Sequence, residues 1–261
     1  MLDIWLPLIG GLVLLVAGGE LLVRGAVQVA SGLGVSPLVI GLTLVGFGTS
    51  TPELVTSVQA ALSGAPGIAY GNIVGSNIAN ILLIGGLSAV LFPIAVTSAT
   101  LQRDGVVMLA VAVVFAAIAA MTVPGILIGA ILVAALALYI YTAFRQERAA
   151  RPAEHGAVYD KSLALQEADP ALAPPDMPGG SLLIPAVTAL AGLVLVVVGG
   201  KFLVAGAVSL ARGLGIFETV IGLTIVAVGT SMPELVTSVM AGLKRQGDRT
   251  STTSWASAAR R

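Results

Sequence analysis

A long internal repeat constrains the fold of this chain more than any other feature. Residues 18–62 and 199–243 align without gaps at an offset of 181, and 29 of the 45 positions are identical. The chain of 261 residues is 57% hydrophobic and only 10% charged, whereas soluble domains carry about 25% charged residues. We therefore expect two related halves whose surfaces face lipid rather than water.

Crossing a bilayer as a helix takes about 20 mostly apolar residues, and seven segments are candidates for this. They are residues 4–23, 37–62, 70–92, 105–121, 125–144, 182–204 and 217–243. Corresponding helices of the repeat stand five places apart in the order of spans, an odd number, so the two copies must cross the membrane in opposite directions. Inverted repeats with discontinuous helices are typical of secondary transporters, whose binding sites lie near the membrane midplane. The predicted fold class is an all-α integral membrane protein of this inverted-repeat type.

Composition divides the chain into four regions. Residues 1–144 form the first transmembrane half, in which the two consecutive polar motifs fall within about 37–92, and residues 145–181 form a charged, proline-rich linker. Residues 182–243 begin the second, inverted half, and residues 244–261 are polar and expected to be disordered or non-native.

The distribution of Lys and Arg predicts the orientation in the membrane. These residues remain on the cytoplasmic side in short loops, and with an external N-terminus nearly all of them, Arg212 excepted, fall inside. The linker is then cytoplasmic. Because no Lys or Arg precedes the first apolar run, we interpret that run as a retained helix rather than a signal peptide.

The sharpest match between the copies is GTSTPELVTS at 48–57 and GTSMPELVTS at 229–238. Proline within a helix cannot donate to the carbonyl four residues earlier, so Gly48 and Gly229 are predicted to present free oxygens. Residues four apart share a helix face. Each motif thus groups hydroxyls with a carboxylate: Thr49, Ser50 and Glu53 in the first copy, Thr230, Ser231 and Glu234 in the second.

These groups are hard oxygen ligands, which Ca²⁺ and alkali cations accept, and the chain has no cysteine to supply a thiolate. A glutamate at membrane depth is costly unless it is paired, and it is a functional residue by default. A structural polar contact between helices is the alternative. Recurrence of the acid in an identical frame favours a cation site.

A polar stripe follows the first motif in YGNIVGSNIANILLIGG, residues 70–86. Asn72, Ser76 and Asn80 recur every four residues, and Asn77 lies close to them. Their oxygens would either bind a cation or form hydrogen bonds between helices, while glycines beside them would allow another backbone to come close.

The motifs GFGTSTPELVTS, GNIVGSNIANI and AVGTSMPELVTS closely resemble the two alpha-repeats of the sodium/calcium exchanger family, within the cation/calcium antiporter superfamily. The resemblance implies ten helices in two inverted halves, alternating access, and electrogenic exchange of several Na⁺ for one Ca²⁺. It implies neither an enzymatic reaction nor a cofactor, since both ions would be substrates. The cation ligands that it implies are Glu53, Glu234, Thr49, Ser50, Thr230, Ser231, Ser76 and Asn80, with backbone carbonyls at Gly46 and Ala227.

The sequence departs from the family pattern after residue 243. The counterparts of Asn72, Ser76, Asn77 and Asn80 would be Thr253, Ser257, Ala258 and Arg261, and only the serine coincides. About seven of ten spans are thus expected, and we expect little transport unless a second chain supplies the remaining helices.

Several alternatives for function and partners follow. The first alternative is still a transporter, but one that exchanges Ca²⁺ for protons or that requires K⁺ as well as Na⁺. The second alternative is of another class: an inactive fragment, or a membrane scaffold that associates with another copy. The expected surroundings are the lipid bilayer. Charge that balances to zero, with no basic face carrying aromatic residues, argues against nucleic acid as a partner.

Overall fold

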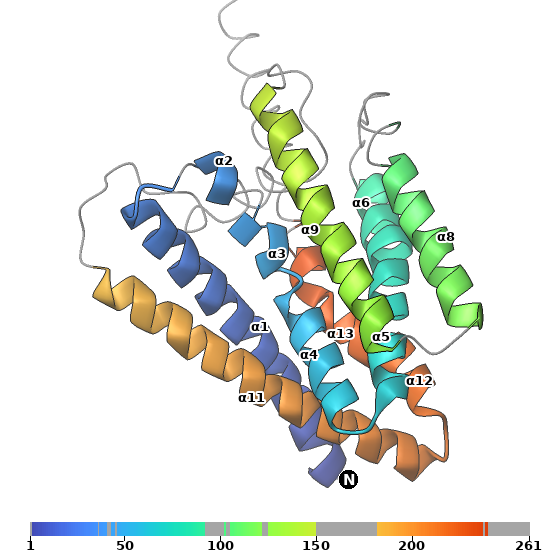
Figure 1. Ribbon diagram of the computed structural model, residues 1–261. Coiled ribbons are helices and arrows are strands. Elements are labelled where there is room, and N and C mark those ends of the chain that lie inside the picture. Colours follow the sequence, from blue (N-terminus) through green and yellow to red (C-terminus); the bar gives the residue numbers. More distant parts are fainter. Residues whose placement is uncertain are drawn as a thin grey trace, which may run out of the picture. The chain divides into compact units, whose positions relative to one another are not determined.

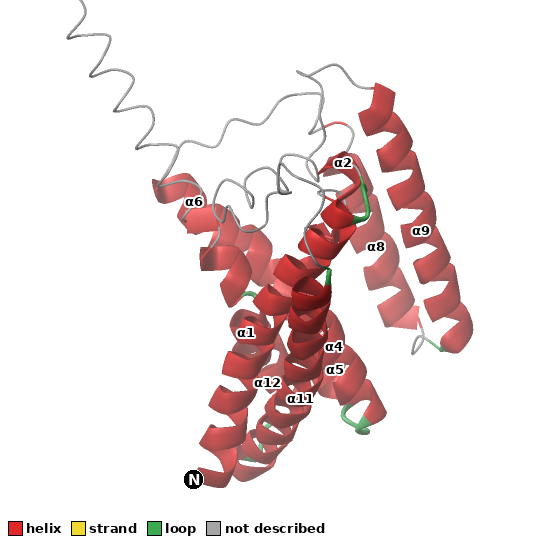
Figure 2. Cartoon of the chain, turned by 90° about the vertical axis from the view of Figure 1, so that its left-hand side faces the viewer, coloured by secondary structure: helices red, strands yellow, loops and turns green. Residues whose placement is uncertain are grey.

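The computed structural model describes residues 2–35, 37–40, 43–44, 46–91, 102, 105–121, 125–149, 182–236 and 238–239. Within these ranges every regular element is a helix, which confirms the predicted all-α fold class (Figures 1 and 2). The predicted tail at 244–261 lies outside the described residues, as does the linker beyond residue 149.

The described helices belong to two compact units. The first unit holds α1 (Leu2–Gly32), α2 (Pro37–Ile40), α3 (Gly46–Gly48), α4 (Thr51–Leu62), α5 (Pro66–Ile78), the π-helix η2 (Ala79–Gly85), α6 (Gly86–Leu91), α11 (Leu183–Leu214), α12 (Glu218–Ile221), the π-helix η5 (Gly222–Val226) and α13 (Ala227–Thr230). The second unit holds α8 (Val106–Met121) and α9 (Ile126–Ala149).

Among the described residues, four stretches of helix are long and apolar enough to cross a membrane: Leu2–Gly32, Pro66–Leu91, Ile126–Arg145 and Leu183–Leu214. The first and last of these extend well beyond the predicted ends at residues 23 and 204, because one or two charged side chains on an exposed face do not interrupt a helix. The predicted spans 37–62 and 217–243 are instead divided into short helical pieces.

Glycines bring α1 and α11 into backbone contact, and the two helices lie side by side in Figures 1 and 2. Three glycines seven residues apart line each helix: Gly11, Gly18 and Gly25 in α1, and their repeat counterparts Gly192, Gly199 and Gly206 in α11. A Cβ atom added at Gly11 would lie 2.7 Å from the backbone oxygen of Gly199, and one at Gly25 would lie 2.7 Å from that of Pro185. Residues later in α1 therefore contact residues earlier in α11. The two helices are antiparallel, as an inverted repeat requires.

A second set of glycines places α5, from the first repeat, against the broken helix of the second. A Cβ atom at Gly71 would lie 2.5 Å from the backbone oxygen of Thr219, and one at Gly75 would lie 2.6 Å from Cβ of Ala227. Helices in membranes approach this closely only where small residues meet. This contact fixes which face of α5 is turned toward α13.

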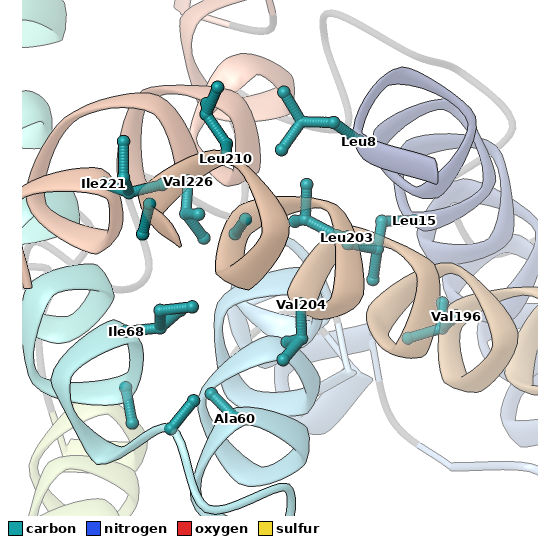
Figure 3. Close-up of a cluster of buried hydrophobic side chains, with 14 residues drawn as sticks. Leu8, Leu15, Ala60, Ile68, Val196, Leu203, Val204, Leu210, Ile221 and Val226 are labelled. Carbon is teal, nitrogen blue, oxygen red and sulfur yellow. The ribbon is translucent and has the colours of Figure 1, made fainter. Parts of the chain in front are cut away.

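Apolar side chains from α1, α4, α5, α11, α12 and η5 form one buried cluster (Figure 3). Its larger members are Leu8, Leu15, Ile68, Val196, Leu203, Val204, Leu210, Ile221 and Val226. The cluster joins the α1–α11 pair to α4, which carries most of the first signature motif, and to η5, which comes directly before α13 and the second motif. It therefore holds the first and second repeats in one body.

Candidate functional site

Both signature motifs interrupt their helices at the same position. Ser50 separates α3 from α4, and Ser231 follows α13 directly; both residues have φ −88° and ψ 6°. This region of backbone conformation is sparsely populated, and many active-site residues adopt it. Pro52 and Pro233 come two residues later and carry no N–H, so the helical hydrogen bond is lost at corresponding points of the two repeats.

The interruptions bring an acidic residue of one repeat to a hydroxyl of the other. Glu53 lies in the first turn of α4, and its Oε1 accepts a hydrogen bond of 3.1 Å from Oγ of Ser231. Glu234 lies three residues after Ser231 in a helical segment, so the two share a side of it. Ser231 and Glu234 are both buried, with exposed fractions of 2% and 5%.

A buried hydrogen-bond network joins α5 to both broken helices. The side-chain oxygen of Asn72 accepts from Oγ1 of Thr230 at 3.1 Å and from Oγ of Ser76 at 3.4 Å. Its nitrogen donates to the backbone oxygen of Glu53 at 3.1 Å and to Oγ of Ser57 at 2.9 Å. Asn72 and Thr230 are fully buried and Ser76 nearly so, so these contacts are protected from solvent.

The other predicted residues lie on the same segments with differing exposure. Ala227 is buried, and its carbonyl accepts from the backbone N–H of Ser231 at 3.1 Å. Thr49 is half-buried within the first interruption, next to the exposed Ser50, and Gly46 begins α3. Asn80 is exposed on η2, one turn beyond Ser76.

Eight of the ten predicted residues fall into two groups by position. The structure gathers Glu53, Thr230, Ser231 and Ser76 through hydrogen bonds, and it places Ala227 and Glu234 beside them on the second broken helix. It leaves Ser50 and Asn80 at the surface of the described part of the chain.

Asn72 and Ser57 take part in more of this hydrogen-bond network than the sequence pattern indicated. The pattern left open whether Asn72 binds a cation or joins helices, and the structure places it at the centre of the contacts between the repeats. Ser57 was not singled out, although its position four residues after Glu53, on the same helix face, was an available signal.

The chemistry of the network is that of hard oxygen: carboxylate, hydroxyl, amide and carbonyl. The described residues contain no cluster of three or more His, Cys, Asp or Glu side chains that would hold a metal ion. A cation between the two motifs would therefore rely on their two carboxylates and on neutral oxygens, a mixture that suits Na⁺ and Ca²⁺.

The family of this chain is decided by comparison with known sequences. The sequence model described as sodium/calcium exchanger protein matches residues 4–145 and 184–258. The chain belongs to the sodium/calcium exchanger family. This membership confirms the resemblance that the repeated motifs carry, and it makes the chain a multi-pass membrane protein.

Similar known proteins align with most of the chain. The sodium/calcium exchanger MaX1 of Methanosarcina acetivorans is 37% identical over an alignment 266 positions long, which covers 93% of this chain and 75% of the relative. The inner membrane protein YrbG of Escherichia coli is 33% identical over 241 residues, 92% of this chain and 71% of the relative. A solved structure of the sodium-calcium exchanger NCX_Mj, soaked with Na⁺ and Sr²⁺, matches with a TM-score of 0.50 and 33% identity, covering 92% of this chain and 72% of that one.

Proposed function

We propose that this member of the exchanger family moves Na⁺ and Ca²⁺ in opposite directions across a membrane, at a site between its two broken helices. The hydrogen bond from Ser231 to Glu53 carries this proposal, because it joins the acidic motif of one repeat to the interruption of the other. The two motif carboxylates together would balance the charge of one Ca²⁺ ion. The names of the relatives support the choice of ions.

The proposed ligands are those that the family resemblance implies. Glu53 and Glu234 would be the central acids, and the remaining oxygens would come from Thr49, Ser50, Ser76, Asn80, Thr230, Ser231 and the carbonyls of Gly46 and Ala227. Their chemistry supports this set, since Ca²⁺ takes six to eight hard oxygens and tolerates carboxylates, carbonyls and hydroxyls together.

Competition between the ions would follow from shared ligands. A site that holds the carboxylates of Glu53, which is partly buried, and of Glu234, which is buried, would concentrate negative charge when no cation is bound, which is costly at membrane depth. Either one Ca²⁺ or several Na⁺ would remove that cost, so only a loaded site would switch easily from one side to the other. Inverted repeats supply two related ways of opening such a site, one to each side of the membrane.

Uptake of Ca²⁺ into proteoliposomes tests this function. In proteoliposomes made with a version of the protein that carries all ten helices of the family pattern, an outward Na⁺ gradient is expected to drive Ca²⁺ inward, and collapse of the Na⁺ gradient is expected to stop it. Uptake that follows a pH gradient instead, or that needs K⁺, would replace Na⁺/Ca²⁺ exchange by one of the two alternative exchange reactions. Binding of neither ion by the purified protein would contradict the proposal altogether.

We also propose an external N-terminus and a cytoplasmic linker. The end of α9 supports an interface at that point, because the guanidinium of Arg145 lies 5.9 Å from the ring centroid of Tyr141, and such pairs gather where membrane meets water. The chain has no cysteine, so single cysteines report position directly. In intact cells, an impermeant maleimide is expected to label Asp3→Cys and to spare Ala157→Cys until the cells are lysed; the reverse pattern would invert the orientation.

A further inference from the structure

The amide of Asn72 uses all of its hydrogen-bonding capacity inside the protein. A primary amide has two N–H donors and an oxygen with two lone pairs. Here the nitrogen donates to the backbone oxygen of Glu53 and to Ser57, while the oxygen accepts from Thr230 and Ser76. The side chain is fully buried, so no water competes for these positions.

Chemistry fixes which end of this amide faces which partner. The backbone oxygen of Glu53 can only accept, so the nitrogen of Asn72 must face α4. The side-chain oxygen then faces the hydroxyls of Thr230 and Ser76. The amide therefore offers an acceptor, and never a donor, to these two hydroxyls.

Thr230 has one hydroxyl proton and three acceptors within reach, of which Oγ of Ser76 is the most distant at 3.5 Å. Its Oγ1 lies 3.1 Å from the side-chain oxygen of Asn72 and 3.2 Å from the carbonyl oxygen of Ala227, in its own helix. That carbonyl already receives the backbone N–H of Ser231. A second proton, from Thr230, would occupy the remaining lone pair of the Ala227 oxygen.

We propose that Asn72 is a positioning residue of the cation site, whose side-chain oxygen draws the hydroxyl protons of Thr230 and Ser76 away from the space where a cation binds. This inference rests on the proposed function. A hydroxyl binds a cation through its oxygen lone pairs, so its proton must point elsewhere. With that proton on Asn72, the hydroxyl oxygens and the second lone pair of Ala227 all remain available to the ion.

A double-mutant cycle tests this coupling. Purified full-length protein in lipid nanodiscs is titrated with CaCl₂ or NaCl by calorimetry. Asn72→Leu and Thr230→Val are each expected to weaken Ca²⁺ binding about tenfold, the worth of one well-placed polar contact. Because both changes remove the same hydroxyl contribution, the double variant is expected to fall well short of the roughly hundredfold loss that independent effects would give. A full hundredfold loss would overturn the proposal.

Two further variants separate proton placement from packing. Asn72→Asp keeps an acceptor at the same place and loses the donors to α4, and it is expected to bind Ca²⁺ at least as tightly as the wild type. Weaker binding, in a variant that remains folded by circular dichroism, would show that the acceptor is not what matters. Asn77→Leu is the matched control on the same helix, because Asn77 donates to the carbonyl of Ile73 in its own helix; wild-type affinity is expected.

The wild-type titration separates failure of the proposed function from failure of the proposed role of Asn72. If the wild-type protein binds neither Ca²⁺ nor Na⁺, the proposed function fails and the role of Asn72 fails with it. If the wild type binds and Asn72→Leu binds equally well, only the role of Asn72 is overturned. The Asn72→Asp titration decides the matter even where the leucine variant does not fold.

Discussion

Replacement of Glu53 by glutamine is expected to weaken Ca²⁺ binding strongly and to abolish Na⁺-driven Ca²⁺ uptake while leaving the fold intact. Glutamine keeps an oxygen that can accept from Ser231, so the contact between the repeats is preserved. The substitution removes one negative charge from the proposed site. A carboxylate that faces a divalent ion away from bulk water contributes several kcal/mol to the binding free energy of that ion. We expect affinity to fall by about a hundredfold or more, as measured by calorimetry and by flux into proteoliposomes.

The same substitution is expected to raise thermal stability in buffer without Na⁺ or Ca²⁺, because a partly buried negative charge is removed. Glu20→Gln is the matched control: this carboxylate pairs with Arg24 on an exposed face of α1, and its repeat counterpart is Lys201. It is expected to leave binding unchanged. Wild-type uptake by Glu53→Gln would remove Glu53 from the site and, with it, the proposed mechanism.

The second large effect is expected on stability, from Gly11→Ala. The new Cβ atom would lie 2.7 Å from the backbone oxygen of Gly199 and 2.8 Å from Cα of Leu203. Backbone atoms of a packed helix cannot move aside cheaply, so we expect a loss of about 1–3 kcal/mol from overpacking. The midpoint of thermal unfolding in detergent, followed by circular dichroism, measures it.

The adjacent glycine supplies the control. A Cβ atom at Gly10 would meet nothing within 4 Å, and alanine is favoured over glycine within a helix by about 0.5–1 kcal/mol. Gly10→Ala is therefore expected to leave stability unchanged or to raise it slightly. Equal midpoints for the two variants would mean that α1 and α11 are not in backbone contact.

The interruption of the helices could be predicted from the sequence because its cause is local. Pro52 and Pro233 lack the N–H that an unbroken helix needs, and each follows a Gly-Thr-Ser stretch in an identical frame. The inverted arrangement was also predictable, since it depends only on counting apolar segments between Gly18 and Gly199. Both inferences use one segment at a time and need no knowledge of how helices pack.

The network around Asn72 could not be predicted in the same way. Its partners belong to α4 and α13, and their approach depends on Gly71 and Gly75 meeting backbone and side-chain atoms of the other repeat. A spacing of four residues shows that Asn72 and Ser76 share a face, but it does not show what that face touches. The exposure of Asn80 on η2 likewise follows from which helices cover it, so its role as a ligand stays a prediction.

The contact between α1 and α11 is self-complementary. Gly11 lies against Gly199, and their repeat counterparts, Gly192 and Gly18, lie against each other. Identical subunits pair through such isologous surfaces. A shorter chain with a single copy of the repeat would therefore form the same contact with a second molecule inserted in the opposite direction. In that dimer, one substitution would change the contact at two places. In a single chain that carries both copies, each side of the contact can take a different residue, as at Glu20 and its counterpart Lys201.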